Sequence, residues 1–430
     1  MSAEAPAPRR FGLVATLLLS GLATGARLVS GFVVNKFLAV YLGAPGIALI
    51  GQFLNFSTIA TVVGSGAIER GVIKYAAEYS DDEEKTADLF STVLRLCALT
   101  SLVTSLAITM AARPLAARIF GDAVHAPVLY VFAAAVPFFV GQAMMVATLN
   151  GRGDIASFVS TQTFGSLISV VFAATLPRFF GVTGALVSLS VAQVLVCGAT
   201  LVSFSRRPWF RRSLFARHAD REMARRLGGY TLMALTSAMV MPVIQILIRA
   251  TIAHSVSWQE AGYWQAVSRI SDAYLMLLTM TLSTYYVPRL SMIKTEGELR
   301  TEVLRAFRLI VPAAAGLALV VYLFRGLVLR SLYTGDFARA ESLFAWQLVG
   351  DVLKMAAWVL GNVMQARAMT RAFIVTEIFF GLGYAALTHV LVTHHGAEGA
   401  VQAFAINYTL YFVMLVVIFR RLLFRRPASP

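Results

Sequence analysis

The chain has 430 residues, of which 58% are hydrophobic and only 14% are charged. Soluble domains carry about 25% charged residues, so this composition excludes an ordinary soluble protein. The formal net charge is +15. Because the basic residues lie in short segments between apolar stretches rather than on one folded face, a nucleic-acid partner is not expected.

Twelve apolar stretches recur along the whole chain, and each is long enough to cross the hydrocarbon core of a bilayer. We therefore predict an all-α polytopic membrane protein with twelve transmembrane helices, at roughly 11–36, 41–66, 88–111, 127–149, 156–177, 182–204, 229–252, 262–288, 304–325, 343–364, 370–392 and 398–419. The two cysteines, Cys97 and Cys197, both lie inside such stretches. Neither a disulfide framework nor a metal site is expected from them.

The distribution of lysine and arginine predicts the orientation of the chain in the membrane. One side of the predicted topology, which includes both termini, receives 23 of these basic residues, and the other side receives six. The excess predicts that both termini are cytoplasmic. It also accounts for most of the positive charge without any partner except the lipid bilayer.

A basic segment near the middle of the chain, SRRPWFRRSLFARHADREMARRLG, separates the first six predicted helices from the last six. We predict a division into an N-terminal bundle, a cytoplasmic linker and a C-terminal bundle, at 1–204, 205–228 and 229–430. An alternative for the linker is an amphipathic helix on anionic lipid, because Trp209, Phe210 and Phe215 lie among its arginines.

The two halves carry signs of an internal repeat. The sequence GVTGA at residues 181–185 recurs as GAEGA at residues 396–400, an offset of 215 residues. Each half has an even number of helices, so both halves insert the same way round. A repeat axis along the membrane normal follows, with a substrate site between two bundles.

The predicted helix 343–364, LFAWQLVGDVLKMAAWVLGNVM, carries two charges in its middle. Asp351 and Lys354 are three residues apart and share one helix face. Inserting two such charges costs about 5–7 kcal/mol, whereas the helix's nine Leu, Ile, Val and Phe residues return about 3–5 kcal/mol. The charged face should therefore look into protein or into a polar cavity.

Other charges also lie inside predicted spans. Arg27 is in the first span, and Arg269 and Asp272 are in the eighth. The pairs Arg269/Asp272 and Asp351/Lys354 have two interpretations: each pair neutralises itself on its own helix, or each lines a substrate pathway. Arg27 has no acid near it on its own helix. It needs either an acid from another helix, such as Asp272 or Asp351, or an anionic substrate. Arg27 is the first candidate for a substrate contact, because a guanidinium suits phosphate.

Two further basic residues, Lys36 and Arg249, lie late in the first and seventh spans. Either they snorkel to the membrane interface or they contribute to the same substrate site.

No motif for catalysis appears in the chain. It contains no Walker A sequence, no His-Glu-x-x-His, no Cys-x-x-Cys and no nucleophile elbow. The loops are too short to hold a glycosyltransferase or polymerase site. We expect no enzymatic activity, no catalytic residue, no cofactor and no bound metal.

Three segments carry a resemblance to a known family: residues 35–40 (NKFLAV), 271–275 (SDAYL) and, most specifically, 343–354 (LFAWQLVGDVLK). With the helix layout, they resemble the Wzx-type lipid-linked oligosaccharide flippases of the multidrug/oligosaccharidyl-lipid/polysaccharide exporter superfamily, and within these the branch that serves enterobacterial common antigen synthesis. The alternative is a cation-coupled exporter of the related MATE class. That class predicts acids in the N-terminal bundle, and the first six spans contain none at mid-span.

The resemblance implies a bacterial inner-membrane protein with two bundles and a cationic central cavity. It implies transport of an undecaprenyl-diphosphate-linked glycan, such as lipid III or an O-antigen repeat unit, from the cytoplasmic to the periplasmic leaflet by alternating access. A polysaccharide polymerase and a chain-length regulator are the implied protein partners. The residues that match intramembrane charges of such flippases are Arg27, Lys36, Arg249, Asp272, Asp351 and Lys354. Arg269 departs from the pattern but remains a candidate for substrate binding.

Overall fold

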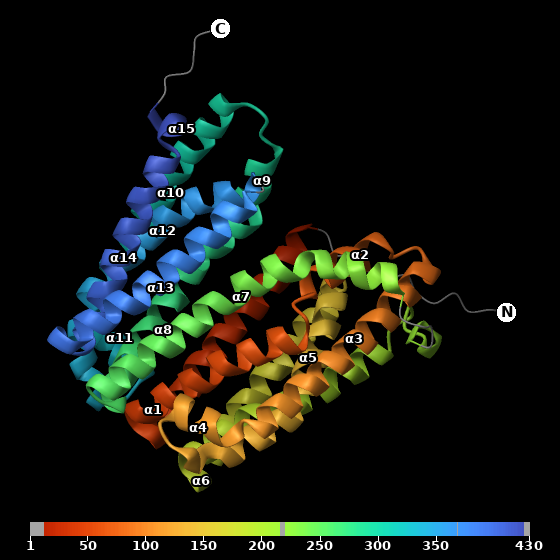
Figure 1. Ribbon diagram of the computed structural model, residues 1–430, viewed down its shortest axis with the longest axis horizontal. Coiled ribbons are helices and arrows are strands. Elements are labelled where there is room, and N and C mark those ends of the chain that lie inside the picture. The colour runs from red at the N-terminus through yellow and green to blue at the C-terminus, as the bar shows by residue number, and fades with distance from the viewer. Residues whose placement is uncertain (1–12, 216–219, 368, 425–430) are drawn as a thin grey trace. The chain divides into compact units, whose positions relative to one another are not determined.

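The computed structural model describes residues 13–215, 220–367 and 369–424, apart from some side chains within the helices (Figure 1). In these residues the chain is helical and contains no strand, which confirms the predicted all-α class. The chain divides into two compact units. The first comprises Met1–Leu42 and Gln52–Pro242, and the second comprises Gly43–Gly51 and Val243–Pro430.

The helices before the central basic segment are, in chain order, α1 (Leu13–Gly64), α2 (Glu69–Glu78), α3 (Glu83–Met110), α4 (Ala112–Phe120), η1 (Ala123–His125), α5 (Ala126–Gly151) and α6 (Ile155–Ser205). A short segment, η2 (Arg212–Phe215), lies inside the basic segment itself.

The remaining helices begin with α7, which runs through the boundary between the units. They are α7 (Arg221–Ser255), α8 (Trp258–Thr281), η3 (Leu282–Tyr286), α9 (Val287–Met292), α10 (Glu296–Leu323), α11 (Arg325–Leu332), η4 (Gly335–Leu343), α12 (Phe344–Ala366), α13 (Thr370–His395), α14 (Ala397–Ile418) and α15 (Arg420–Phe424).

Every predicted span has a helical counterpart. In the part of the chain that the structure describes, nine helices are long and apolar enough to cross a membrane. Two of them, α1 and α6, each contain two predicted spans. The remaining predicted span, 262–288, corresponds to α8, η3 and the start of α9. It lies outside that set, and its α8 part carries Arg269 and Asp272.

Two glycines break the long helices. Gly43 in α1 (φ 63°) and Gly181 in α6 (φ 56°) have positive φ and non-helical ψ. A side chain at either position would be strained, because L-residues other than glycine rarely adopt such conformations. Each glycine therefore separates two spans with almost no loop between them.

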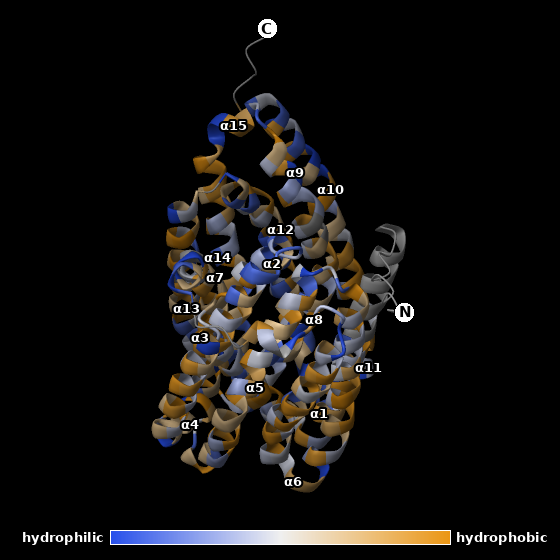
Figure 2. Ribbon diagram, turned by 90° about the vertical axis from the view of Figure 1, so that its right-hand side faces the viewer, coloured by the Kyte–Doolittle hydropathy of each residue, from blue (hydrophilic) through white to orange (hydrophobic). Residues whose placement is uncertain are grey.

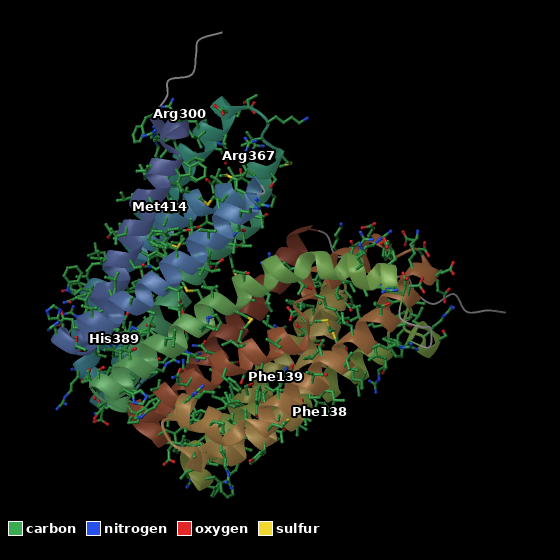
Figure 3. The ribbon with its side chains drawn as sticks, viewed as in Figure 1. Phe138, Phe139, Arg300, Arg367, His389 and Met414 are labelled. Atoms are coloured by element: carbon green, nitrogen blue, oxygen red, sulfur yellow. The ribbon has the colours of Figure 1, made fainter. Side chains whose placement is uncertain are left out.

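In the first unit, α5 packs against α3 and α6, and in the second unit α12 packs against α10 and α14 (Figure 1). Hydrophobic residues predominate along the helix bodies, and hydrophilic residues are seen around α2 and in part of α15, which lie beside the ends of longer helices (Figure 2). Within the second unit, Arg300 and Arg367 lie at one end and His389 lies near the other (Figure 3). A protein with apolar helix bodies and polar ends is suited to a bilayer.

The aromatic residues of the basic segment pack onto the first unit. The Phe204 and Trp209 rings lie 4.9 Å apart, and Phe215 stacks on Phe90 of α3 at 5.6 Å. The segment is also tied by the Leu214 carbonyl, which accepts a hydrogen bond from Ser91 at 3.0 Å. These rings are engaged with protein, so the alternative of an amphipathic helix on the lipid surface does not fit.

Arg152, between α5 and α6, joins this aromatic packing to the neighbouring loop. Its guanidinium lies 4.9 Å from the Trp209 ring centroid and donates hydrogen bonds to the Thr86 hydroxyl at 3.0 Å and the Ser80 carbonyl at 3.3 Å. Burial lowers the pKa of Arg152 below its ordinary value. An arginine in this position holds three segments of the first unit together.

Candidate functional site

The charged helix of the sequence analysis, α12, is largely enclosed by the second unit. A glycine allows this enclosure: a Cβ atom at Gly350 would collide with the ring of Phe404 on α14. One residue further on, the side chain of Asp351 is fully buried. The prediction that the charged face of this helix looks into protein is therefore confirmed for Asp351.

The Asp351 carboxylate is satisfied by neutral donors on two helices. Tyr274 of α8 donates its hydroxyl proton to Oδ2 at 2.8 Å, and Gln347 of α12 donates from Nε2 to Oδ1 at 3.2 Å. Both carboxylate oxygens accept a hydrogen bond, which offsets part of the cost of burying the group.

Lys354 forms an ion pair between helices. Its Nζ lies 3.6 Å from Oδ1 of Asp272 on α8. The ammonium also lies 5.4 Å from the Trp358 ring centroid and 6.0 Å from that of Phe404, within the range of cation–π attraction. The pair therefore joins α12 to α8, which differs from the interpretation in which each charged pair neutralises itself on one helix.

The two partners of this ion pair differ in exposure. The Lys354 side chain is 13% exposed, whereas that of Asp272 is 59% exposed. A carboxylate that faced lipid at mid-membrane would cost about 3 kcal/mol. The exposed carboxylate of Asp272 is therefore better placed against a polar cavity than against lipid.

Arg249 of α7 is fully buried and belongs to a separate contact in the same unit. Its Nε donates to Oε1 of Gln265 at 2.9 Å, and Nη2 donates to the same oxygen. The guanidinium also lies 5.6 Å from the Trp264 ring centroid. This burial does not fit the alternative in which Arg249 snorkels to the membrane interface.

The structure places the other three predicted residues on α1 and α8. Arg269 lies on α8, half-buried, one turn before Asp272. Lys36 lies half-buried on α1. The backbone of Arg27 is part of α1, but its side chain lies outside the described residues. The structure thus brings Asp272, Asp351 and Lys354 together in the second unit.

Sequence reasoning missed two kinds of residue here. Tyr274 and Gln347 contact Asp351, yet as neutral residues they gave no signal of their own. Glu377 of α13 is an acid within the predicted span 370–392, and its Oε2 is buried with no hydrogen-bond partner among the described residues. Its position inside an apolar span was the available signal.

Comparisons with known proteins found both sequence relatives and structural neighbours. A family model described as "Polysaccharide biosynthesis protein" matches residues 43–341. A lipid III flippase from Escherichia coli K12 and one from Shigella flexneri are each 32% identical over 411 residues, covering 96% of this chain and 98% of theirs.

Solved structures show the same fold at low sequence identity. The inward-facing conformation of a multidrug resistance MATE family transporter of the MOP superfamily aligns with a TM-score of 0.76 and 16% identity, covering 96% of this chain and 97% of that one. An outward-facing conformation gives 0.67 and 16%, covering 95% of each chain. A MOP superfamily transporter from Pyrococcus furiosus gives 0.61 and 17%, covering 95% and 98%.

These likenesses confirm the predicted fold of twelve transmembrane helices in two bundles. From the matched family model and the flippase relatives, the chain belongs to the polysaccharide biosynthesis protein family, built on the fold of the MOP superfamily transporters.

Proposed function

We propose that this protein carries an undecaprenyl-diphosphate-linked oligosaccharide, such as lipid III or an O-antigen repeat unit, from the cytoplasmic to the periplasmic leaflet of the bacterial inner membrane. Transport would proceed by alternating access, with both termini in the cytoplasm. The observation that carries the proposal is the charged cluster of Asp272, Lys354 and Asp351 within apolar helices of a chain 32% identical to lipid III flippases.

The chemistry of the cluster suits a lipid-linked diphosphate. Lys354 already holds one carboxylate, that of Asp272, at a distance that an incoming phosphate oxygen can match. If a phosphate oxygen takes the place of the Asp272 carboxylate at this ammonium, Lys354 keeps a partner, and the displaced carboxylate is exposed rather than buried. Arg27, Lys36 and Arg269 are the further basic groups proposed for the pathway.

Arg249 has a different place in the proposal. Its guanidinium is buried against Gln265 and Trp264, so it holds α7 to α8 in this arrangement. A contact between Arg249 and substrate would first require the bond to Gln265 to open.

The membrane potential supplies a driving force for this direction of transport. The cell interior is negative, and moving one charge across 100 mV is worth about 2.3 kcal/mol. Export of a diphosphate with about two negative charges is then favoured by about 4–5 kcal/mol. Removal of the product by a polysaccharide polymerase and a chain-length regulator, the proposed partners, would add to this. No catalytic step by the protein itself is needed.

Drug export by a MATE-like cation-coupled mechanism is not proposed. The MATE structures are 16–17% identical to this chain, so their likeness concerns the fold alone.

Deletion of the gene tests the proposal. A lipid-linked oligosaccharide should then accumulate in the cytoplasmic leaflet, where mass spectrometry would identify its glycan. Arg27→Ala and Arg27→Lys are introduced into the complementing gene, with Arg367→Ala as a control at an exposed cytoplasmic position. Full complementation by both Arg27 variants would refute the role of Arg27. Absence of any accumulated lipid-linked sugar in the deletion strain would refute the function.

A charge exchange tests the cluster itself. Asp272→Lys should abolish transport by placing two cations together, and Asp272→Lys/Lys354→Asp should restore part of it. If the exchanged pair folds but does not transport, the positions of the two charges, and not only their attraction, matter to the substrate.

A further inference from the structure

A cavity of about 410 Å³ lies where α10 passes into α11, and it shares no lining residue with the charged cluster described above. Seven residues line it: Leu323, Phe324, Arg325, Gly326, Leu327, Arg330 and Glu341. The cavity combines two arginines, one acid and three large apolar side chains. Neither the family relationship nor the proposed transport mechanism assigns it a role.

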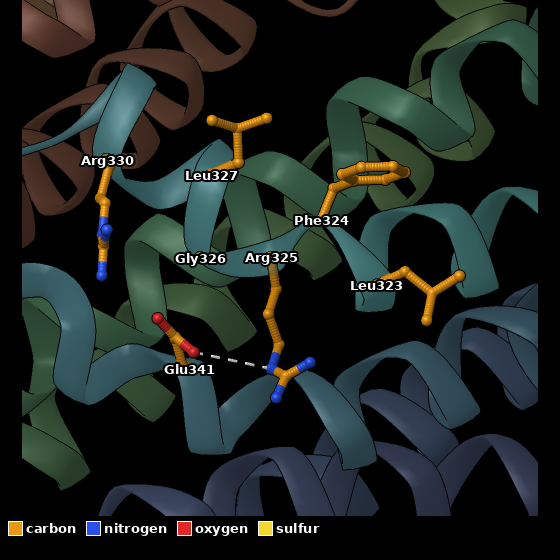
Figure 4. A pocket seen from close by; sticks show the side chains of 7 residues that line it. All are labelled: Leu323, Phe324, Arg325, Gly326, Leu327, Arg330 and Glu341. Atoms are coloured by element: carbon orange, nitrogen blue, oxygen red, sulfur yellow. Dashed lines mark ion pairs between the residues drawn. The ribbon is translucent and has the colours of Figure 1, made fainter.

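The charged side chains lie on one side of the chain. In Figure 4, Arg325 and Arg330 extend to the same side as Glu341, whereas Leu327 and Phe324 point away from it. Arg325 Nε lies 3.8 Å from Glu341 Oε2, and Arg325 Nη1 donates to the Tyr322 carbonyl at 2.8 Å. These contacts engage only part of the five N–H donors that a guanidinium presents.

A glycine places the acid in the cavity. A Cβ atom at position 326 would lie 2.9 Å from Glu341 Oε1, so any larger side chain would push this carboxylate away. Gly326 thereby lets Glu341 approach the backbone of α11 and reach Arg325. Arg325, Arg330 and Glu341 together give the cavity a net charge of +1.

The apolar side chains beside these charges are open to the surroundings. Leu323, Phe324 and Leu327 are each more than half exposed. A charged cavity bordered by exposed apolar side chains at the end of a transmembrane helix matches the interface of a bilayer, where headgroups meet acyl chains.

We propose that this cavity binds the headgroup of a membrane phospholipid that carries both a phosphate and an ammonium, as phosphatidylethanolamine does. Arg325 and Arg330 would hold the phosphate, since arginine forks suit phosphate oxygens. Glu341 would accept a hydrogen bond from the ammonium. The acyl chains would lie along Leu323, Phe324 and Leu327.

The presence of Glu341 decides between lipid classes. A purely anionic headgroup gains from the arginines but meets repulsion from the carboxylate. A headgroup with both charges meets an opposite charge at each end. The three protein charges therefore complement a zwitterionic headgroup better than an anionic one.

The first unit provides a matched control. The sequence Arg113-Pro-Leu-Ala-Ala-Arg118 on α4 corresponds to Arg325-Gly-Leu-Val-Leu-Arg330 on α11 at an offset of 212 residues. The same offset places buried Leu129 opposite Glu341 and Pro114 opposite Gly326. The arginine pair thus occurs in both halves, but the acid and the glycine that admits it occur in the second half alone.

Native mass spectrometry of the purified full chain tests the proposal. Phosphatidylethanolamine, phosphatidylglycerol and inorganic phosphate are titrated separately against the unmodified protein, Arg325→Ala/Arg330→Ala, Glu341→Gln and the control Arg113→Ala/Arg118→Ala. The unmodified protein and the control should retain phosphatidylethanolamine. The variant Arg325→Ala/Arg330→Ala should bind it at least about tenfold more weakly, as expected for lost charge-assisted hydrogen bonds.

Glu341→Gln carries the test of lipid class, and it remains informative if the double arginine variant fails to fold. This variant should lose its preference for phosphatidylethanolamine and bind phosphatidylglycerol at least as well. Equal retention of phosphatidylethanolamine by the unmodified protein and the double arginine variant would overturn the site. An unchanged preference in Glu341→Gln would overturn the role of the acid, and tight binding of inorganic phosphate would show an anion site that does not need lipid.

Discussion

The two units bury different groups where α5 and α12 share a Val-Gly pair. Val140-Gly141-Gln142 on α5 corresponds to Val349-Gly350-Asp351 on α12 at an offset of 209 residues, and Met145 corresponds to Lys354. Gln142 is buried, and its Oε1 has no hydrogen-bond partner among the described residues. Asp351 is fully buried, but each of its oxygens accepts a hydrogen bond.

This difference shows that a charged site needs more than a charged residue. The second unit supplies the acid, its neutral donors Tyr274 and Gln347, and a separate partner, Asp272, for the neighbouring lysine. The first unit has an amide at the acid's position and a thioether at the lysine's. The two bundles share helix packing, but the interhelical ion pair between α8 and α12 has no counterpart at the corresponding position on α5.

The largest effect on stability should come from placing an acid at position 142 of the first unit. Gln142→Asp would bury a carboxylate without the donors that serve Asp351, at a cost of about 3 kcal/mol of unfolding free energy. Denaturant unfolding in detergent measures this loss of unfolding free energy. The control Gln142→Leu should stay within about 0.5 kcal/mol, because it removes an unsatisfied oxygen. Equal stability of the two variants would contradict the comparison.

Removing the acid from the second unit should have the next largest effect. Asp351→Leu leaves the Tyr274 hydroxyl and the Gln347 amide without their acceptor, so we expect a loss of about 2–3 kcal/mol. The same unfolding experiment, run beside Gln142→Leu, compares the two units directly. A loss as small as that of Gln142→Leu would mean that the hydrogen bonds around Asp351 contribute nothing to stability.

A smaller contrast is expected at the loops that follow α5 and α12. Arg152→Ala removes two hydrogen bonds and the contact with Trp209, so it should cost about 1–2 kcal/mol. Arg367, at the equivalent turn of the second unit, is exposed, and Arg367→Ala should change stability by less than about 0.5 kcal/mol. Thermal unfolding of both variants checks the contrast, and equal shifts would show that the Arg152 contacts are weak.

The smallest effect concerns the ion pair itself. A double-mutant cycle with Asp272→Asn and Lys354→Met should give a coupling energy below about 1 kcal/mol, because Asp272 is 59% exposed and solvent screens the pair. A coupling above about 2 kcal/mol would mean that the pair is far less solvated than its exposure indicates.

Much of the fold could be predicted because apolar stretches about 20 residues long report membrane helices directly. The unusual residues of α12 were also visible, since charge in an apolar helix stands out. The ion-pair partner was not. Spacing along a helix favours Lys354 with Asp351, whereas the partner Asp272 is set by how α8 packs on α12.

Two other outcomes depended on packing and not on local pattern. Arg249 lies near a predicted span end, where snorkelling is the usual expectation, yet Gln265 and Trp264 bury it. Trp209 lies among arginines in a sequence typical of a membrane surface, yet it packs on Phe204. In both cases an aromatic or amide partner on another segment determines where the side chain lies. A single sequence does not reveal which segments pack together.

The short segment Gly43–Gly51 has a consequence for how the protein is made. It belongs to the second unit, although residues on both sides of it belong to the first. A Cβ atom at Gly51 would lie 2.7 Å from the Gln265 side chain, so this residue of α1 is fitted to α8. At about 5–20 residues per second, a ribosome needs about 10–40 s to synthesise the chain between Gly51 and Gln265. The two halves of α1, which meet at Gly43, must therefore stay in the membrane for that time, because α8, the helix against which Gly51 packs, has not yet been synthesised.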